Sequence, residues 1–203
     1  MLPSALALAI PSMFTLAGLV FAQASPPAAT TFSLRVSIAV DDAGKPLADA
    51  AWLAAEIDAA EALFEPFGVR FAKADGAPLE ARVAHVETRA DRNALASHVT
   101  PHVIDVFVVG SLRDVDDPTQ VRRGVHGHAP SGAHYLILVA SAPRTVLAHE
   151  LGHYFGNPHS HVLDNVMSYE RSGAPVFFDA DQGKRIAARA LTYVKSGELL
   201  PVP

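Results

Sequence analysis

AHELGHYFGNPH, residues 148–159, is the stretch of sequence that decides both the fold and the chemistry expected of this chain. On a helix, His149 and His153 are about one turn apart and therefore lie on the same face. Two imidazoles placed in this way can bind one metal ion, and Glu150 beside them is a candidate general base. The stretch therefore predicts a helix that carries a metal site.

A sharp turn is expected directly after this helix. Gly156 can take the left-handed conformation that ends a helix, and Pro158 prevents the helix from resuming. The turn would swing His159 back towards the same ion, and His161 is the alternative third ligand. Three neutral imidazoles leave a fourth position open for water, which is the arrangement of catalytic rather than structural zinc. The competing interpretation is a buried helix that merely carries histidines.

The segment Asn165-Val166-Met167-Ser168-Tyr169 adds independent support. HExxHxxGxxH followed by a methionine turn resembles the metzincin zinc endopeptidases. The resemblance implies that Met167 lies beneath the three histidines as an apolar floor. It also implies that Tyr169 can approach the zinc or stabilise an oxyanion. Ordinary core packing for Met167 and a place in the pocket wall for Tyr169 are the alternatives.

The subfamily features are mixed. The short run from His159 to Met167, with Ser160 after the third histidine, resembles matrixins, whereas the Met-Ser-Tyr turn is similar to serralysins and the pappalysin-like group. Asp181-Gln182 and Arg185 also resemble the C-terminal helix of that last group. The fold implied is a metzincin-like α/β (α+β) zincin. It has a mixed twisted sheet with an antiparallel edge strand, an active-site helix, the methionine turn and a C-terminal helix.

Length and composition limit the possibilities. The chain has 203 residues, enough for one domain with a sizeable core. Its net charge of −5, without a basic cluster, argues against nucleic acid or an anionic membrane as the main partner. Cysteine is absent, so disulfides, lipid attachment through cysteine and a cysteine switch that blocks the zinc are all excluded.

The N-terminus is typical of a secretory signal peptide. The first 24 residues carry no charge, the segment 2–21 is apolar, and Ala22-Gln23-Ala24 is a small-x-small cleavage site. We expect cleavage after Ala24 and a secreted or periplasmic protein, with residues 25–203 forming a single, monomeric catalytic domain. A retained membrane anchor is the alternative, because the segment lacks the usual Lys or Arg near its start.

Periodicity predicts the elements around the metal helix. A helix that begins at Asp49 carries an apolar stripe. A last helix is expected after Asp179, because Asp179 and Gln182 resemble a capping box. The stripes are Leu53, Ile57, Ala60, Phe64 and Phe67 for the first helix, and Ile186, Ala187, Ala190, Leu191 and Val194 for the last. The predicted strands are 31–40, 69–72, 103–109 and 135–140, with 103–109 central and buried, and 90–97 is a possible helix.

Residues 124–128 match the position of the metzincin edge strand, along which an extended peptide substrate would pair. Alternation places His126 and His128 on one face of this strand, and His134 follows shortly afterwards. We expect these histidines to face solvent or the substrate rim, with a second metal site as the alternative.

Two loops near the expected site also have alternatives. Asp114, Asp116 and Asp117 lie in an acidic loop, for which we favour solvation over a calcium site. The segment 171–178 corresponds to the loop that forms a pocket wall in metzincins. Val176, Phe177 and Phe178 would line the pocket or be buried in the core.

The sequence thus predicts a secreted zinc endopeptidase. Zinc on His149, His153 and His159 would activate water, and Glu150 would act as general base. A zinc hydrolase of a non-peptide bond and a catalytically silent zinc-bearing binding module are the two alternatives.

Overall fold

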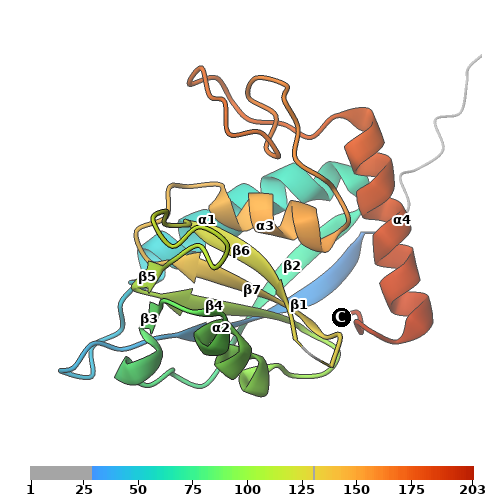
Figure 1. Cartoon of the computed structure of the whole chain (residues 1–203). Coiled ribbons are helices and arrows are strands. Elements are labelled where there is room, and N and C mark those ends of the chain that lie inside the picture. The colour runs from blue at the N-terminus through green and yellow to red at the C-terminus, as the bar shows by residue number, and fades with distance from the viewer. Residues whose placement is uncertain (1–28, 130) are drawn as a thin grey trace, which may run out of the picture.

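A five-stranded mixed sheet forms the centre of the molecule (Figure 1). The computed structural model describes residues 29–129 and 131–203, so the predicted signal peptide and its cleavage site lie outside the described residues. The strand order is β2-β1-β4-β7-β6. All neighbours are parallel except β6, which runs antiparallel to β7 at one edge. The strands are β1 (Thr30–Ile38), β2 (Val69–Asp75), β4 (Ile104–Val109), β6 (Gly124–His128) and β7 (His134–Val139).

Both faces of the sheet are covered, which explains the apolar run in β4. Every residue of β4 is buried, as expected of a central parallel strand. Helices α1 (Ala50–Phe64), α3 (Val146–Tyr154) and α4 (Ala180–Ser196) pack in the core that includes Leu34, Val106 and Leu136. Helix α2 (Arg89–Leu95) lies on the opposite face, near β3 (His85–Val86) and β5 (Ser111–Leu112) (Figure 1).

The part of the chain that the structure describes also contains three single-turn 3₁₀ helices, η1 (Glu65–Phe67), η2 (Ala81–Val83) and η3 (Ala96–His98). Among the described residues, none of the helices combines the length and apolar character needed to cross a membrane. The predicted mixed sheet, antiparallel edge strand and C-terminal helix are all present, so the predicted fold class is confirmed.

Helix α1 begins as the sequence predicts. The Asp49 side chain accepts a hydrogen bond from the backbone N–H of Trp52, at 2.7 Å, and so caps the helix. Four of the five residues of the predicted stripe, Leu53, Ile57, Ala60 and Phe64, are buried, and Phe67 lies beyond the helix and is partly buried. The stripe also contains Glu56, a buried carboxylate that the pattern of apolar residues does not reveal.

The C-terminal helix α4 carries the predicted capping box, because the Asp179 and Gln182 side chains each bond the backbone of the other. The predicted apolar face was partly wrong: Leu191 is 58% exposed, whereas Tyr193 is buried. The cause is the helical period, since position 191 lies one residue, about 100°, beyond the buried Ala190. Position 193 lies three residues beyond it and returns to the same face.

Candidate metal centre and cleft

Helix α3 begins with an unusual arrangement. The helix starts at Val146, after Thr145, whose φ of 88° is left-handed. Thr145 supplies no side-chain cap. Instead Glu56 of α1 accepts hydrogen bonds from the backbone N–H groups of Thr145 and Leu147, the latter at 3.1 Å. A carboxylate from a neighbouring helix therefore stabilises the start of the helix that carries the site.

Burial raises the pKa of Glu56 to about 7, against the opposing effect of these two hydrogen bonds. Its Oε1 atom has no hydrogen-bond partner among the described residues. Glu56 was missed by the sequence analysis. The available signal was a single acidic residue on an otherwise apolar helix face.

The structure brings His149, His153 and His159 together, as predicted. The ring centroids are 4.8 Å apart for His149 and His153, 5.4 Å for His149 and His159, and 4.6 Å for His153 and His159. One ligand nitrogen from each lies within 4.8 Å of the others, a spacing that could hold a metal ion. We call these three residues the helix cluster. His161 is exposed and belongs to no such group among the described residues.

Backbone carbonyls fix the orientation of two of these rings. The Nδ1 atom of His149 lies 2.7 Å from the carbonyl oxygen of Val166, and that of His153 lies 2.8 Å from the carbonyl oxygen of Asn157. A carbonyl can only accept, so each Nδ1 must donate, and each Nε2 then presents a lone pair. Burial lowers the pKa of all three histidines, that of His149 to about 4, which favours the neutral form that binds metal.

Gly156 ends the helix segment with a φ of 87°, as predicted. Its backbone N–H donates to the carbonyl oxygen of His153 at 2.9 Å. The chain then turns so that His159 faces the two helical histidines.

The methionine turn, Asn165–Tyr169, lies against α3. Met167 is fully buried, and a Cβ atom added to Gly152 of α3 would lie 2.2 Å from its sulfur. Only glycine at position 152 therefore leaves room for this sulfur. The same turn anchors the segment after the third histidine, because the Ser160 N–H donates to the carbonyl oxygen of Met167 at 3.0 Å.

A buried amide pair links the methionine turn to α4. The Asn165 Nδ2 donates to the Gln182 Oε1 at 2.7 Å, and the Gln182 Nε2 donates to the Asn165 Oδ1 at 3.0 Å. Arg185 of α4 also donates to the Asn157 side chain at 3.0 Å. The sequence analysis named Gln182 as a cap but gave no sign that it also holds the turn.

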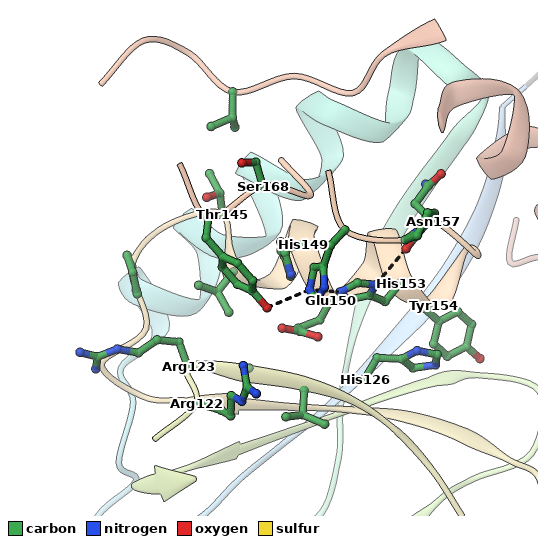
Figure 2. Close-up of a pocket in the computed structure, with 18 of the residues that line it drawn as sticks. Arg122, Arg123, His126, Thr145, His149, Glu150, His153, Tyr154, Asn157 and Ser168 are labelled. Carbon is green, nitrogen blue, oxygen red and sulfur yellow. Dashed lines mark hydrogen bonds between the residues drawn. The ribbon is translucent and has the colours of Figure 1, made fainter. Parts of the chain in front are cut away.

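Glu150 lies between α3 and the edge strand β6 (Figure 2). Burial raises the pKa of its carboxyl to about 8, opposed by a hydrogen bond from the backbone N–H of His126 and by the charge of Arg122. A Cβ atom added to Gly124 would lie 2.8 Å from the Glu150 Oε1 atom. Glycine at this position lets the strand approach the carboxylate closely.

Tyr169 is 69% exposed, yet its hydroxyl lies 2.8 Å from the His159 Nε2 atom. Its ring centroid is 5.6 Å from that of His149. The hydroxyl thus lies at the open side of the helix cluster.

A cleft of about 1540 Å³ runs between β6 and α3, and the methionine turn and the following loop form its other wall. The Arg123 carbonyl accepts from the Val139 N–H of β7, at 2.9 Å, whereas the His126 N–H points to Glu150. Because backbone direction alternates along a strand, Gly124, His126 and His128 direct their backbone groups away from β7. The edge is therefore placed where an extended peptide could pair.

The loop 171–178 divides between the two expected roles. Val176 lines the cleft, as the first alternative stated. Phe178 is buried in the core, and its ring centroid is 5.0 Å from that of Phe64. Phe177 is 41% exposed, and its carbonyl accepts from the Val166 N–H at 2.8 Å.

The acidic loop holds its carboxylates in separate contacts. Asp114 accepts from the backbone N–H groups of Asp116 and Asp117 and pairs with Arg122. Asp116 pairs with Arg89, at 2.8 Å. Among the described residues, these three carboxylates do not gather into a group that could hold a metal.

A second group of three histidines, His126, His128 and His134, also gathers its ligand nitrogens within 4.8 Å. We call it the strand cluster. It lines the same cleft as the helix cluster. The sequence analysis expected these residues to face solvent or the substrate rim; in the structure only His128 is exposed, and His126 and His134 are partly buried.

Comparison with known proteins gives a structural match but no sequence match. No family model matches the sequence, and no curated protein does either. The structure is similar to the crystal structure of metalloproteinase-II from Bacteroides fragilis, with a TM-score of 0.55 and 14% sequence identity. The chain therefore shares the fold of that protein. The similarity covers 81% of this chain but only 55% of the Bacteroides chain, so this chain spans about half the length of its structural neighbour.

Proposed function

We propose that this protein is a zinc-dependent endopeptidase of the metzincin type. The observation that carries the proposal is the helix cluster: three converging imidazoles beside a buried carboxylate, in a cleft with an open strand edge. The metalloproteinase fold supports a peptidase but does not identify the metal, the base or the substrate.

The residues present fit a zinc ion. Three neutral imidazoles suit zinc, and three protein ligands leave the open position that catalysis requires. His149 and His153 would bind through Nε2, because carbonyl oxygens occupy their Nδ1 atoms. A zinc ion bound here would act as a Lewis acid, polarising a peptide carbonyl and making water acidic near neutral pH.

Glu150 would carry out the proton transfers. In the hypothesis, its carboxylate takes the proton of the attacking water and passes it to the leaving amine nitrogen. A nearby dication would favour the ionised carboxylate, and so counteract the burial that raises the pKa of Glu150 in the protein alone. Tyr169 would donate a hydrogen bond from its hydroxyl to the oxyanion.

Peptide recognition would use the outward backbone groups of Gly124 and His128 and the carbonyl of His126, because the His126 N–H already bonds Glu150. An extended chain would add to the sheet along β6 and lie across the helix cluster. This geometry favours an endopeptidase, since the residues that line the cleft include Arg144 before α3 and Asn157 after it.

The decisive experiment compares wild type with Glu150→Gln on a broad peptide library, with zinc content determined on the same samples. Glu150→Gln keeps the size of the side chain but cannot accept the proton. We expect one zinc at the helix cluster in both proteins and a loss of activity of about 10²–10⁴-fold in the variant. Glu170→Gln, an exposed neighbour of the methionine turn, is the matched control and should retain activity.

The outcomes separate the alternatives. Undiminished activity in Glu150→Gln would reject the assigned base. Zinc without cleavage of any peptide would favour a silent binding module or a hydrolase of another bond. If the protein is folded but its helix cluster takes up no zinc, the proposed function is wrong.

We also propose that the protein is exported, on the strength of residues 1–24 alone, and acts as a monomer. Mass spectrometry of the exported protein would test the cleavage site. The mature chain should begin at Ser25, and a chain that keeps residues 1–24 would favour the membrane-anchor alternative.

A further inference from the structure

The strand cluster resembles the helix cluster in its spacing. Its ring centroids are 4.6 Å apart for His126 and His128, 5.0 Å for His126 and His134, and 4.2 Å for His128 and His134. The His126 Nε2 atom lies 3.0 Å from the His134 Nδ1 atom. Two imidazoles on a tetrahedral zinc, with bonds of about 2.0–2.1 Å, hold their nitrogens about 3.3 Å apart. A small adjustment would therefore admit an ion.

Strand pairing produces this convergence. His126 and His128 are two residues apart on β6, so they share one face of the sheet. His134 is the cross-strand partner of His128 and therefore lies on that same face. The backbone ladder thus fixes all three Cα positions, and the site needs no rearrangement of the chain.

The strand cluster is partly enclosed by other side chains rather than open to solvent. His126 and His134 are partly buried, and the Tyr154 ring packs against both, with centroid distances of 5.5 and 5.3 Å. Tyr193 of α4 adds a second aromatic wall at 6.4 Å from His134. An apolar shell of this kind lowers the local dielectric and keeps imidazoles neutral, the form that binds metal.

We propose that His126, His128 and His134 bind a second zinc-type divalent ion in the same cleft. Three imidazoles suit zinc and related first-row ions rather than calcium or magnesium, which prefer oxygen ligands. The fourth position would be open, as at the helix cluster, so the ion would form part of the surface against which a substrate lies. This second site rests on its own three ligands and does not require the proposed function.

The competing explanation is a direct hydrogen bond between His126 and His134, without any ion. The two explanations differ in stoichiometry. The test uses the purified protein, stripped with a chelator, dialysed against excess Zn²⁺ and freed of unbound ion, with zinc per chain measured by mass spectrometry.

Four variants make this measurement specific. His128→Ala removes the exposed member of the strand cluster, and His153→Ala removes one ligand of the helix cluster. The double variant removes one ligand from each. His85→Ala, an exposed histidine outside both groups, is the matched control. Circular dichroism checks that each variant is folded, and His126→Ala replaces His128→Ala if the latter is not.

We expect two zinc ions per chain in wild type and His85→Ala, one in each single cluster variant, and none in the double variant. A wild-type protein that binds one ion, and retains it in His128→Ala, would overturn the proposal. If wild type binds one ion and His128→Ala binds none, the strand site stands and the zinc site of the proposed function fails. Uptake of two ions that His128→Ala does not reduce would also overturn the proposal.

Discussion

The helix cluster and the strand cluster share their ring spacing but not their support. In the helix cluster, carbonyl oxygens of Val166 and Asn157 hold two rings by Nδ1 at 2.7 and 2.8 Å. Each cluster also has a contact between two of its ligands, at 3.0 Å for His126 and His134 and at 3.1 Å for His153 and His159. Among the described residues, however, no carbonyl oxygen holds a ring of the strand cluster. The positive charge of Arg189 also lowers the pKa of His134, in addition to the effect of burial. Similar ligand sets can therefore differ in how far they are prepared for an ion.

This difference predicts a large gap in zinc affinity. Second-shell partners are worth about 10–100-fold each, so two carbonyls favour the helix cluster by about 10²–10⁴-fold. His128→Ala keeps only the helix cluster intact, and His153→Ala keeps only the strand cluster intact. Chelator competition on these two variants measures each affinity separately. Equal affinities would show that the carbonyl contacts do not matter.

The second prediction concerns Glu56, which supports only the helix cluster through the start of α3. Its pKa of about 7 in the folded protein lies above the ordinary value of 4.5, so the folded state binds the extra proton. The stabilisation that protonated Glu56 contributes to the folded state is therefore fully present below about pH 4.5, and it is lost as the pH rises to about 7. The total loss is about 3 kcal/mol, at 1.36 kcal/mol per unit of pKa.

The Glu56→Gln side chain does not titrate, so the variant should lack this loss of stability with rising pH. The stability of the variant relative to wild type should rise between pH 5 and pH 8. Urea unfolding of both proteins across this range measures the difference, with Glu170→Gln as the control. A difference independent of pH would show that Glu56 titrates normally.

The third prediction is that Gly152→Ala destabilises the protein, because the added methyl group would meet the sulfur of Met167. Overpacking of this kind costs about 1–3 kcal/mol. Zinc affinity should fall at the helix cluster and stay unchanged at the strand cluster. A double-mutant cycle with Met167→Ala measures the clash in urea unfolding. If Gly152→Ala costs the same in both backgrounds, the contact with the sulfur is not the cause.

The smallest effect is expected from Tyr169→Phe. The Tyr169 side chain is exposed, so we expect about a 10-fold decrease in kcat rather than the 10²–10³-fold typical of a buried oxyanion donor. Zinc content should not change. Loss of zinc in this variant would instead make the phenol a metal ligand.

The histidine spacing and Gly156 could be predicted from the sequence because helical periodicity and the left-handed turn are local properties. The apolar run in β4 and the cap of α1 at Asp49 are predictable for the same reason. The role of Glu56 could not be predicted, because its hydrogen bond to Leu147 joins residues 91 positions apart. The Asn165–Gln182 pair also depends on how α4 docks, which no local pattern specifies.

The strand cluster is an intermediate case. Alternation along β6 gave the common face of His126 and His128, but the contribution of His134 depends on the register between β6 and β7. A shift of one residue would turn its side chain to the opposite face. The sequence alone therefore led to the expectation that these histidines face solvent or the substrate rim, whereas the convergence of the three rings required the register.

The closeness of Glu150 to β6 has a consequence for the solution behaviour of the protein. An unpaired strand edge can recruit the edge of another molecule and so start aggregation. Here Glu150 already occupies the outward N–H of His126, and Gly124 brings the strand close against α3. This buried side chain thus takes up a backbone group in the middle of the edge that another copy of the chain would need for pairing, while a short peptide could still enter the cleft.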